Sequence, residues 1–211
     1  ALVGSVLKQH QAMLTAIAGN PALPARTLII CNIVDRAVAI HAQIKSQKPE
    51  GCDLLLLHSR FRPPERRVQM ERLKREALAG FQKGQIVVAT QVIEAGVDVS
   101  SGILWSEVAP LASLVQRFGR LNRAGEFNES AWKPLAIVVG VGVQDAQPGE
   151  KKEAREKREK DNAKCCLPYE FSKCKEAEAV LARLKGDASP ASFEHQQIRA
   201  AVAASIPHCP Y

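Results

Sequence analysis

Five short apolar runs, separated by segments with helical spacing, constrain the fold of this chain more than any other feature. Each run is continuously hydrophobic and rich in β-branched residues, as expected for strands covered on both faces of a parallel sheet. The runs occupy residues 27–32, 53–58, 85–90, 102–108 and 134–141. Helices are predicted at 2–17, 34–47, 64–81 and 111–121. This alternation predicts an α/β fold with a doubly wound parallel sheet, helices on both faces and functional loops at the carboxyl ends of the strands.

The character of the sequence changes after Val143. Residues 150–164 carry mixed charge and almost no apolar side chain, which is typical of a solvated helix or a surface linker. Two further helices are predicted at 175–185 and 192–204. We therefore expect three parts, namely a sheet domain at 1–143, a charged linker at 144–166 and a helical extension packed on the domain at 167–211.

The charge and the cysteine content indicate the class of binding partner and the cellular compartment. Lys and Arg number 29 against 22 Asp and Glu, and the net charge of +7 favours a polyanionic partner. A disulfide framework is not expected, because Cys31 lies in an apolar run, Cys165 and Cys166 are adjacent and the chain is too long to need such bridges. The cysteines also lack the C-x-x-C spacing of a zinc site, so we predict reduced thiols in a cytoplasmic protein and no metal site. No apolar run approaches the ~18 residues of a membrane span, so no membrane partner is predicted.

The loop after the third run combines three useful groups. Thr90 supplies a hydroxyl, Gly96 lets a ligand approach the backbone, and Asp98 supplies a carboxylate of the kind that binds ribose hydroxyls. Many loops that follow a strand contain these residue types, so the pattern by itself only favours a nucleotide.

The most informative stretch is LVQRFGRLNRAGE. Arg117, Arg120 and Arg123 recur every third residue, and guanidiniums so close repel one another unless an anion lies among them. On a helix, Gln116 shares a face with Arg120 and Arg123, so their side chains could converge. Arginine matches phosphate oxygens bidentately, and an arginine finger stabilises γ-phosphate transfer, for which Gln116 is suited to orient the attacking water. The alternative is a basic helix face that pairs with carboxylates such as Glu107, Glu126 and Glu129.

Together these segments resemble the second RecA-like domain of superfamily 2 helicases. ATQVIEAGVDVS is similar to motif V of that family, and QRFGRLNRAGE is similar to motif VI. TLIICNIVDRA resembles motif IV, and LLLHSRFRPPERR resembles the segment that follows it. Within the superfamily, LLHSRF, ATQVIEAG and APLASLVQRFGRLNRAG are most similar to the CRISPR-associated helicase-nuclease of type I systems. The resemblance covers residues 27–141 and implies a RecA-like parallel sheet.

The resemblance implies roles on the nucleotide side of this domain. Gln116, Arg120 and Arg123 would face the γ-phosphate, the two arginines as fingers, whereas Arg117 would be structural. Gly96 would approach the nucleotide, and Asp98 would bind its ribose.

A second group of residues is implied to bind nucleic acid. Thr90 and Arg66 would contact backbone phosphates, and His58, eight residues before Arg66, closes the preceding strand. Asn32, which ends the motif IV strand, completes this group.

Three positions depart from the family pattern. Ile33 has no hydroxyl where a threonine is common, which removes one expected backbone contact. Gly96 stands where serine is common and is typical of DEAD-box proteins instead. Asn122 replaces the glycine of the common G-R-x-G-R form, which fits the CRISPR branch.

Other parts that such a motor needs are absent from the sequence. It contains no Gly-Lys and no Asp-Glu dipeptide, so ATP and Mg²⁺ would be held mainly by a first RecA-like domain of the same protein. None of the five histidines precedes an Asp, so the nuclease domain that the resemblance implies is expected elsewhere too. We therefore expect a part of a longer protein that is inactive alone.

The resemblance also implies partners and a location. It predicts the second motor domain of an ATP-dependent DNA helicase that works on single-stranded DNA with a CRISPR surveillance complex in the cytoplasm of a prokaryote. One alternative is a DEAD-box-like RNA helicase domain, which Gly96 favours and Gln116 disfavours. Another is a non-catalytic nucleic-acid-binding module, against which intact Arg120 and Arg123 argue.

Overall fold

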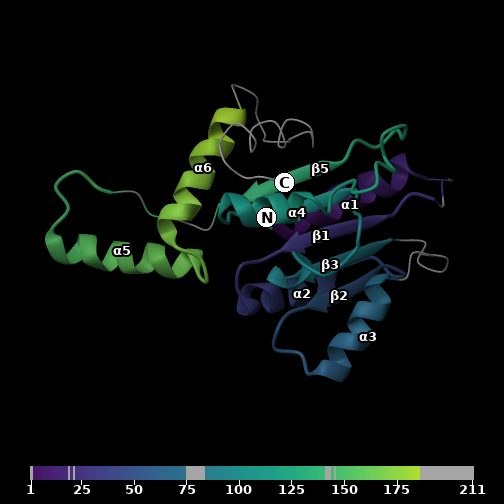
Figure 1. Ribbon diagram of the computed structural model, residues 1–211, viewed down its shortest axis with the longest axis horizontal. Coiled ribbons are helices and arrows are strands. Elements are labelled where there is room, and N and C mark those ends of the chain that lie inside the picture. Colours follow the sequence, from purple (N-terminus) through teal and green to yellow (C-terminus); the bar gives the residue numbers. More distant parts are fainter. Residues whose placement is uncertain are drawn as a thin grey trace.

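The computed structural model describes residues 2–18, 20, 22–74, 84–140, 144 and 146–185. Within them, five parallel strands form one sheet in the order β2-β3-β1-β4-β5 (Figure 1). The strands are β1 (Arg26–Ile30), β2 (Asp53–Leu57), β3 (Gln85–Ala89), β4 (Ile103–Glu107) and β5 (Leu135–Val139). The predicted α/β fold with a parallel sheet is confirmed, and each strand lies at its apolar run.

Helices cover both faces of the sheet, which explains why the strands are apolar without alternation. Leu28 and Ile30 of β1 belong to one core cluster, whereas Ile29 between them belongs to the other. The first cluster includes side chains from α3 (Pro63–Lys74), α4 (Leu111–Phe118) and α6 (Phe171–Lys185). The second includes side chains from α1 (Leu2–Ala16) and α2 (Val34–Gln47).

The end of α4 differs from the prediction. A helix to Leu121 was expected, but α4 ends at Phe118, and the N–H of Gly119 caps it by donating to the carbonyl of Val115 at 2.9 Å. Leu121 instead forms a parallel bridge to Ser101, just before β4. Asn122 follows with a φ of 47°, a left-handed conformation that suits glycine and is tolerated by asparagine. This backbone geometry accounts for asparagine at the family's glycine position.

The other helices agree with the sequence where the structure describes them. The helix predicted at 34–47 is α2 with the same bounds, and α3 is described to Lys74, so the predicted part at 75–81 lies outside the described residues. The helix predicted at 175–185 begins earlier, at Phe171, and the one at 192–204 also lies outside the described residues.

The charged segment forms a helix, α5 (Lys152–Cys166), which extends away from the sheet (Figure 1). Its side chains are mostly exposed, although Asn162 is buried and bonds both the N–H and the carbonyl of Gln144. In contrast, α6 packs Ala177 and Leu181 into the same cluster as α4. The three-part division of the chain stays a prediction.

Five cysteines in the described part are free thiols, namely Cys31, Cys52, Cys165, Cys166 and Cys174. Cys209 lies outside the described residues. No helix in the described ranges has the length and hydrophobicity to span a bilayer.

Candidate nucleotide and nucleic-acid site

The candidate residues lie at two opposite edges of the sheet. Asn32, His58 and Thr90 follow β1, β2 and β3, so they share the carboxyl edge, as predicted for functional loops. From Thr90 the chain passes through a 3-10 turn, η1 (Gln91–Ile93), and returns to the amino edge, where β4 begins. There the carbonyl of Ser100 accepts from Nη1 of Arg26, the first residue of β1, at 2.8 Å. The candidate nucleotide-binding residues Gly96, Asp98, Gln116, Arg120 and Arg123 are called the nucleotide group here. The expectation that functional loops gather at the carboxyl ends does not describe this candidate group.

Arg123 and Asp98 form an ion pair near this amino edge. Nε of Arg123 donates to Oδ1 of Asp98 at 2.6 Å, and Nη1 donates to the carbonyl of Gly119 at 3.2 Å. The N–H of Arg123 also donates to Oγ of Ser100 at 2.9 Å. Since the side chains of Arg123 and Asp98 are 45% and 87% exposed, both charges can be reached by a ligand.

Arg120 lies close to this pair but in a different environment. The residue is only 5% exposed, and its Nε and Nη2 donate to the carbonyls of Ile93 (3.1 Å) and Glu94 (2.7 Å). Burial lowers the pKa of Arg120, the charge of Arg123 lowers it further, and Asp98 opposes both. The sequence resemblance implied the same finger role for Arg120 and Arg123. In the structure the guanidinium of Arg120 is enclosed, whereas that of Arg123 is exposed.

Gln116 and Gly96 complete the nucleotide group. Gln116 is exposed on α4, but the helical spacing that was expected to align it with both arginines ends at Phe118. Gly96 has a φ of 70°, and a Cβ built there would meet no atom within 4 Å. The backbone conformation, not crowding, therefore favours glycine, and the peptide is open to a ligand.

A cavity of about 470 Å³ opens beside Asp98. Its walls combine apolar side chains with charged ones, and they include Leu23, Pro24, Arg26, Val99, Ser100 and Glu126. The lining is therefore strongly polar, with two cationic side chains (Arg26 and Lys74) and two anionic ones (Asp98 and Glu126).

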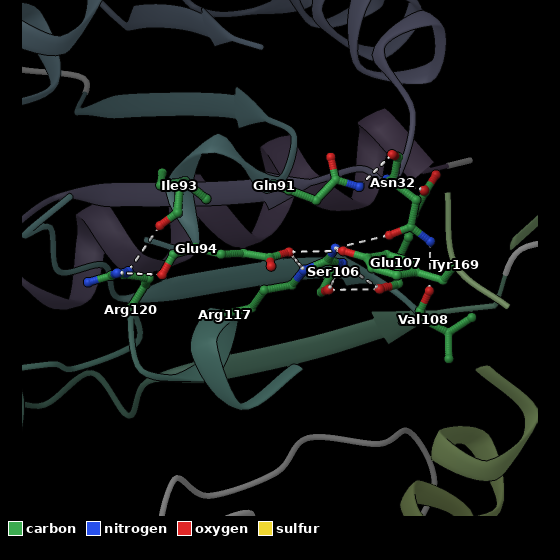
Figure 2. A network of polar contacts seen from close by, with 10 residues as sticks. All are labelled: Asn32, Gln91, Ile93, Glu94, Ser106, Glu107, Val108, Arg117, Arg120 and Tyr169. Atoms are coloured by element: carbon green, nitrogen blue, oxygen red, sulfur yellow. Dashed lines mark hydrogen bonds and ion pairs between the residues drawn. The ribbon is translucent and has the colours of Figure 1, made fainter. Parts of the chain in front are cut away.

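Arg117 is the centre of a buried polar network between the two edges (Figure 2). Its side chain is fully buried, and its Nε donates to Oε1 of Glu94 at 2.9 Å. Its Nη1 and Nη2 donate to Oγ of Ser106 (2.9 Å) and to Oδ1 of Asn32 (3.1 Å). A buried guanidinium needs both a countercharge and full hydrogen bonding, and Arg117 has both. This geometry agrees with the structural role expected for Arg117.

Asn32 is part of the same network. Its Nδ2 donates to the carbonyl of Val108 at 2.7 Å, and its carbonyl accepts from Nε2 of Gln91 at 2.7 Å. Its N–H donates to Oε2 of Glu107 at 2.6 Å. The backbone carbonyl of Asn32 links the loop after β1 to Gln91 in the loop after β3, whereas its side chain bonds Val108 and Arg117. The residue is 2% exposed, so any contact of its side chain with nucleic acid would have to replace these bonds.

The remaining nucleic-acid candidates lie around the loop after β2. The ring of His58 stacks on Phe61, with centroids 4.1 Å apart, and its Nδ1 has no hydrogen-bond partner. Burial, and then the charge of Arg60, lower the pKa of His58, which favours its neutral imidazole. Arg66 is exposed and donates to the carbonyl of Ser59 at 3.0 Å, whereas Thr90 is buried. An aromatic pair beside an exposed arginine can receive a base and a phosphate.

Reasoning from the sequence missed Glu94, Phe61 and Tyr169. Glu94 lies inside the motif V segment, and Phe61 lies inside the LLHSRF segment, so their positions within these motifs could have indicated both residues. The hydroxyl of Tyr169 contacts Arg117 across 52 residues of sequence, and no local pattern indicates that contact. In the described part of the chain, no three His, Cys, Asp or Glu side chains gather as a metal site.

The sheet, the glycine-bearing loop after β3 and the arginine-bearing end of α4 define the class of this protein: it contains a RecA-like helicase domain of the second, C-terminal type. Residues 24–126 match the family model described as CRISPR-associated nuclease/helicase Cas3, C-terminal. This segment of the chain is therefore similar to the C-terminal helicase domain of Cas3 proteins.

Individual relatives agree with this assignment. The chain is 39% identical over 104 residues to the CRISPR-associated nuclease/helicase Cas3 of Haloferax volcanii, which covers 48% of this chain and 11% of the relative. The T. fusca Cas3-ADP crystal structure aligns with a TM-score of 0.61 at 23% identity, over 92% of this chain and 21% of that chain. A chain of a pre-nicking CRISPR RNA-guided surveillance complex aligns with a TM-score of 0.55 at 24% identity. The alignment covers 89% of this chain and 22% of that chain. At these identities the structures show the fold, and this chain spans a small part of each protein.

Proposed function

We propose that this chain is the second motor domain of an ATP-dependent DNA helicase and nuclease of CRISPR interference. The observation that carries the proposal is the exposed guanidinium of Arg123, paired with Asp98 beside an open peptide at Gly96. A non-catalytic module that only binds nucleic acid would have no use for an arginine finger. The name of the T. fusca structure supports a nucleotide ligand for a Cas3 protein.

In this proposal, ATP lies between this domain and a first RecA-like domain. Asp98 would accept hydrogen bonds from the ribose hydroxyls, and Arg123 would leave Asp98 to stabilise charge on the γ-phosphate. Arg120, held by two carbonyls, would place a second positive charge behind Arg123, and Gln116 would orient the attacking water. We assign Mg²⁺ to the first domain, since the described residues of this chain provide no cluster of acidic ligands.

Single-stranded DNA would cross the carboxyl edge of the sheet. The stacked His58 and Phe61 offer a face for a base, and Arg66 and Thr90 offer phosphate contacts. Because nucleotide and DNA occupy opposite edges, closure of the cleft at one edge would be transmitted through the domain to the other.

The proposed partners follow from the relatives. They are the first RecA-like domain and the nuclease domain of the same protein, and a CRISPR surveillance complex of the kind named in one aligned structure. A prokaryotic cytoplasm is the proposed location.

The test joins this chain to a first RecA-like domain and measures ATP hydrolysis with and without single-stranded DNA. Arg120→Ala and Arg123→Ala should each lower the stimulated rate at least about a hundredfold. Arg155→Ala, which removes an exposed arginine on α5, is the matched control and should keep the parental rate. Near-parental hydrolysis by the Arg123→Ala protein would show that Arg123 is not a finger.

A further inference from the structure

The segment between α5 and α6 closes the network around Arg117 (Figure 2). The hydroxyl of Tyr169 accepts from Nη2 of Arg117 at 3.1 Å and donates to Oε1 of Glu94 at 3.2 Å. Since Arg117 also donates to Oε1 of Glu94, the three side chains form a closed ring of hydrogen bonds. A phenol can donate and accept at once, so the tyrosine hydroxyl satisfies both charged neighbours.

The main chain around Tyr169 holds this hydroxyl in place. The N–H of Tyr169 donates to the carbonyl of Cys166 at 2.9 Å, and the neighbouring carbonyl of Cys165 accepts from Nη2 of Arg36 at 3.2 Å. Two residues later α6 begins, and it packs Ala177 into the core cluster that contains α4. These contacts tie Tyr169 to the C-terminal segment, while its hydroxyl bonds Glu94 of the loop.

Glu94 connects this ring to the nucleotide group. Its side chain bonds Tyr169 and Arg117, while its own carbonyl and that of Ile93 hold the guanidinium of Arg120. A displacement of Glu94 would therefore displace Arg120. On the other side, Arg117 bonds Asn32, a nucleic-acid candidate at the carboxyl edge, so the ring lies between Asn32 and the nucleotide group.

We propose that Tyr169 is a positioning residue of the motor, which fixes the loop at 91–100 through Glu94 and so couples DNA binding to ATP hydrolysis. This inference rests on the proposed function. It also gives the C-terminal segment a role, because a partner that moves the junction of α5 and α6 would displace the guanidinium of Arg120.

The first measurement uses the chain alone and does not depend on any activity. Tyr169→Phe keeps the ring over Arg117, whose Cζ lies 5.9 Å from the centroid, and removes only the hydroxyl. Hydrogen exchange at 91–100, where the N–H of Glu94 donates to the carbonyl of Gln91 at 2.9 Å, should accelerate about tenfold. In Tyr169→Phe, the exchange rates in β3 should stay at the parental values. The control variant Glu176→Gln, on the exposed side of α6, should keep the parental exchange rates throughout. Faster exchange in β3 as well would indicate a general loss of stability and would overturn the positioning role.

The second measurement uses the chain joined to a first RecA-like domain. Tyr169→Phe should lower the stimulation of ATP hydrolysis by single-stranded DNA about tenfold, with a smaller change in the unstimulated rate. Parental exchange at 91–100 would overturn the positioning role, and faster exchange with parental stimulation would overturn the coupling. If the parental protein shows no stimulated hydrolysis at all, the proposed function fails, and the exchange result still decides whether Tyr169 fixes the loop.

Discussion

Nε of Arg123 lies 2.6 Å from Oδ1 of Asp98, and 25 residues of sequence separate the two side chains. Each partner is exposed, so water screens the pair and it adds little to stability. Arg120, next to them, is enclosed and bound to two carbonyls. The two arginines should therefore differ in what they contribute to the fold.

This difference can be measured on the chain alone. Arg123→Ala should lower the free energy of unfolding by at most about 1 kcal/mol, because its ion pair is exposed. Arg120→Ala should cost about 1–3 kcal/mol, because two loop carbonyls lose their donor. Urea unfolding monitored by circular dichroism measures both, and an equal loss in the two variants would contradict the geometry.

Arg117 should be the most sensitive charged position in the described part of the chain. Arg117→Ala removes a fully buried guanidinium and leaves the partly buried carboxylate of Glu94 without its countercharge, which should cost about 3–5 kcal/mol of unfolding free energy. The midpoint of urea unfolding reports this loss. Arg155→Ala breaks an exposed ion pair of the same chemistry and should leave that midpoint unchanged.

Substitution by alanine should lower the stability at one glycine and raise it at another. A Cβ at Gly102 would lie 2.5 Å from Sδ of Met13 and 2.9 Å from Cζ of Phe127, so Gly102→Ala should cost about 1–3 kcal/mol. A Cβ at Gly4, inside α1, would meet nothing within 4 Å, so Gly4→Ala should add about 0.5–1 kcal/mol of helix stability. Thermal unfolding of the two variants tests the pair, and a higher melting temperature for Gly102→Ala would refute the packing argument.

The departure at Ile33 suggests a stabilising substitution. Ile33 is the N-cap of α2, with extended φ and ψ of −123° and 149°, and it makes no side-chain cap. Ile33→Thr supplies a hydroxyl that can accept from the first turn, and should add about 0.5–1 kcal/mol to the free energy of unfolding. Ile33→Val is the matched control, since it keeps the β-branched shape without the hydroxyl and should not stabilise.

Buried thiols predict a loss of stability at high pH. Burial raises the pKa of Cys31 to about 12 and that of Cys52 to about 11, from an ordinary value of 9.0. The folded state therefore holds protons that the unfolded state releases above pH 9, and each such thiol removes about 1.4 kcal/mol of stability per pH unit between its two pKa values. The urea midpoint should be flat from pH 7 to 8 and fall from pH 9 to 11. In Cys31→Ala the urea midpoint should fall less steeply with pH than in the parent, because one buried thiol has been removed. The lysines titrate alike in both proteins, so they do not contribute to the difference.

The local sequence predicted the sheet and most of the helices. An apolar strand buried on both faces requires continuous hydrophobic residues, so β1 and β3 can be recognised without any knowledge of their neighbours. The candidate residues were found for a similar reason, since the motifs V and VI are contiguous in sequence. The limits of α4 were not found, because Leu121 leaves the helix to pair with Ser101, a contact that depends on the tertiary structure.

What the sequence determined by itself is therefore the layout of strands and helices and the identity of the arginine-bearing stretch, because both follow from local spacing. The tertiary structure alone decided which arginine is exposed and which is enclosed, and that Tyr169 from the C-terminal segment completes the ring around Arg117. The physical reason is that a guanidinium's environment depends on carbonyls and carboxylates brought by other segments, and only the packed chain places those groups within hydrogen-bonding distance.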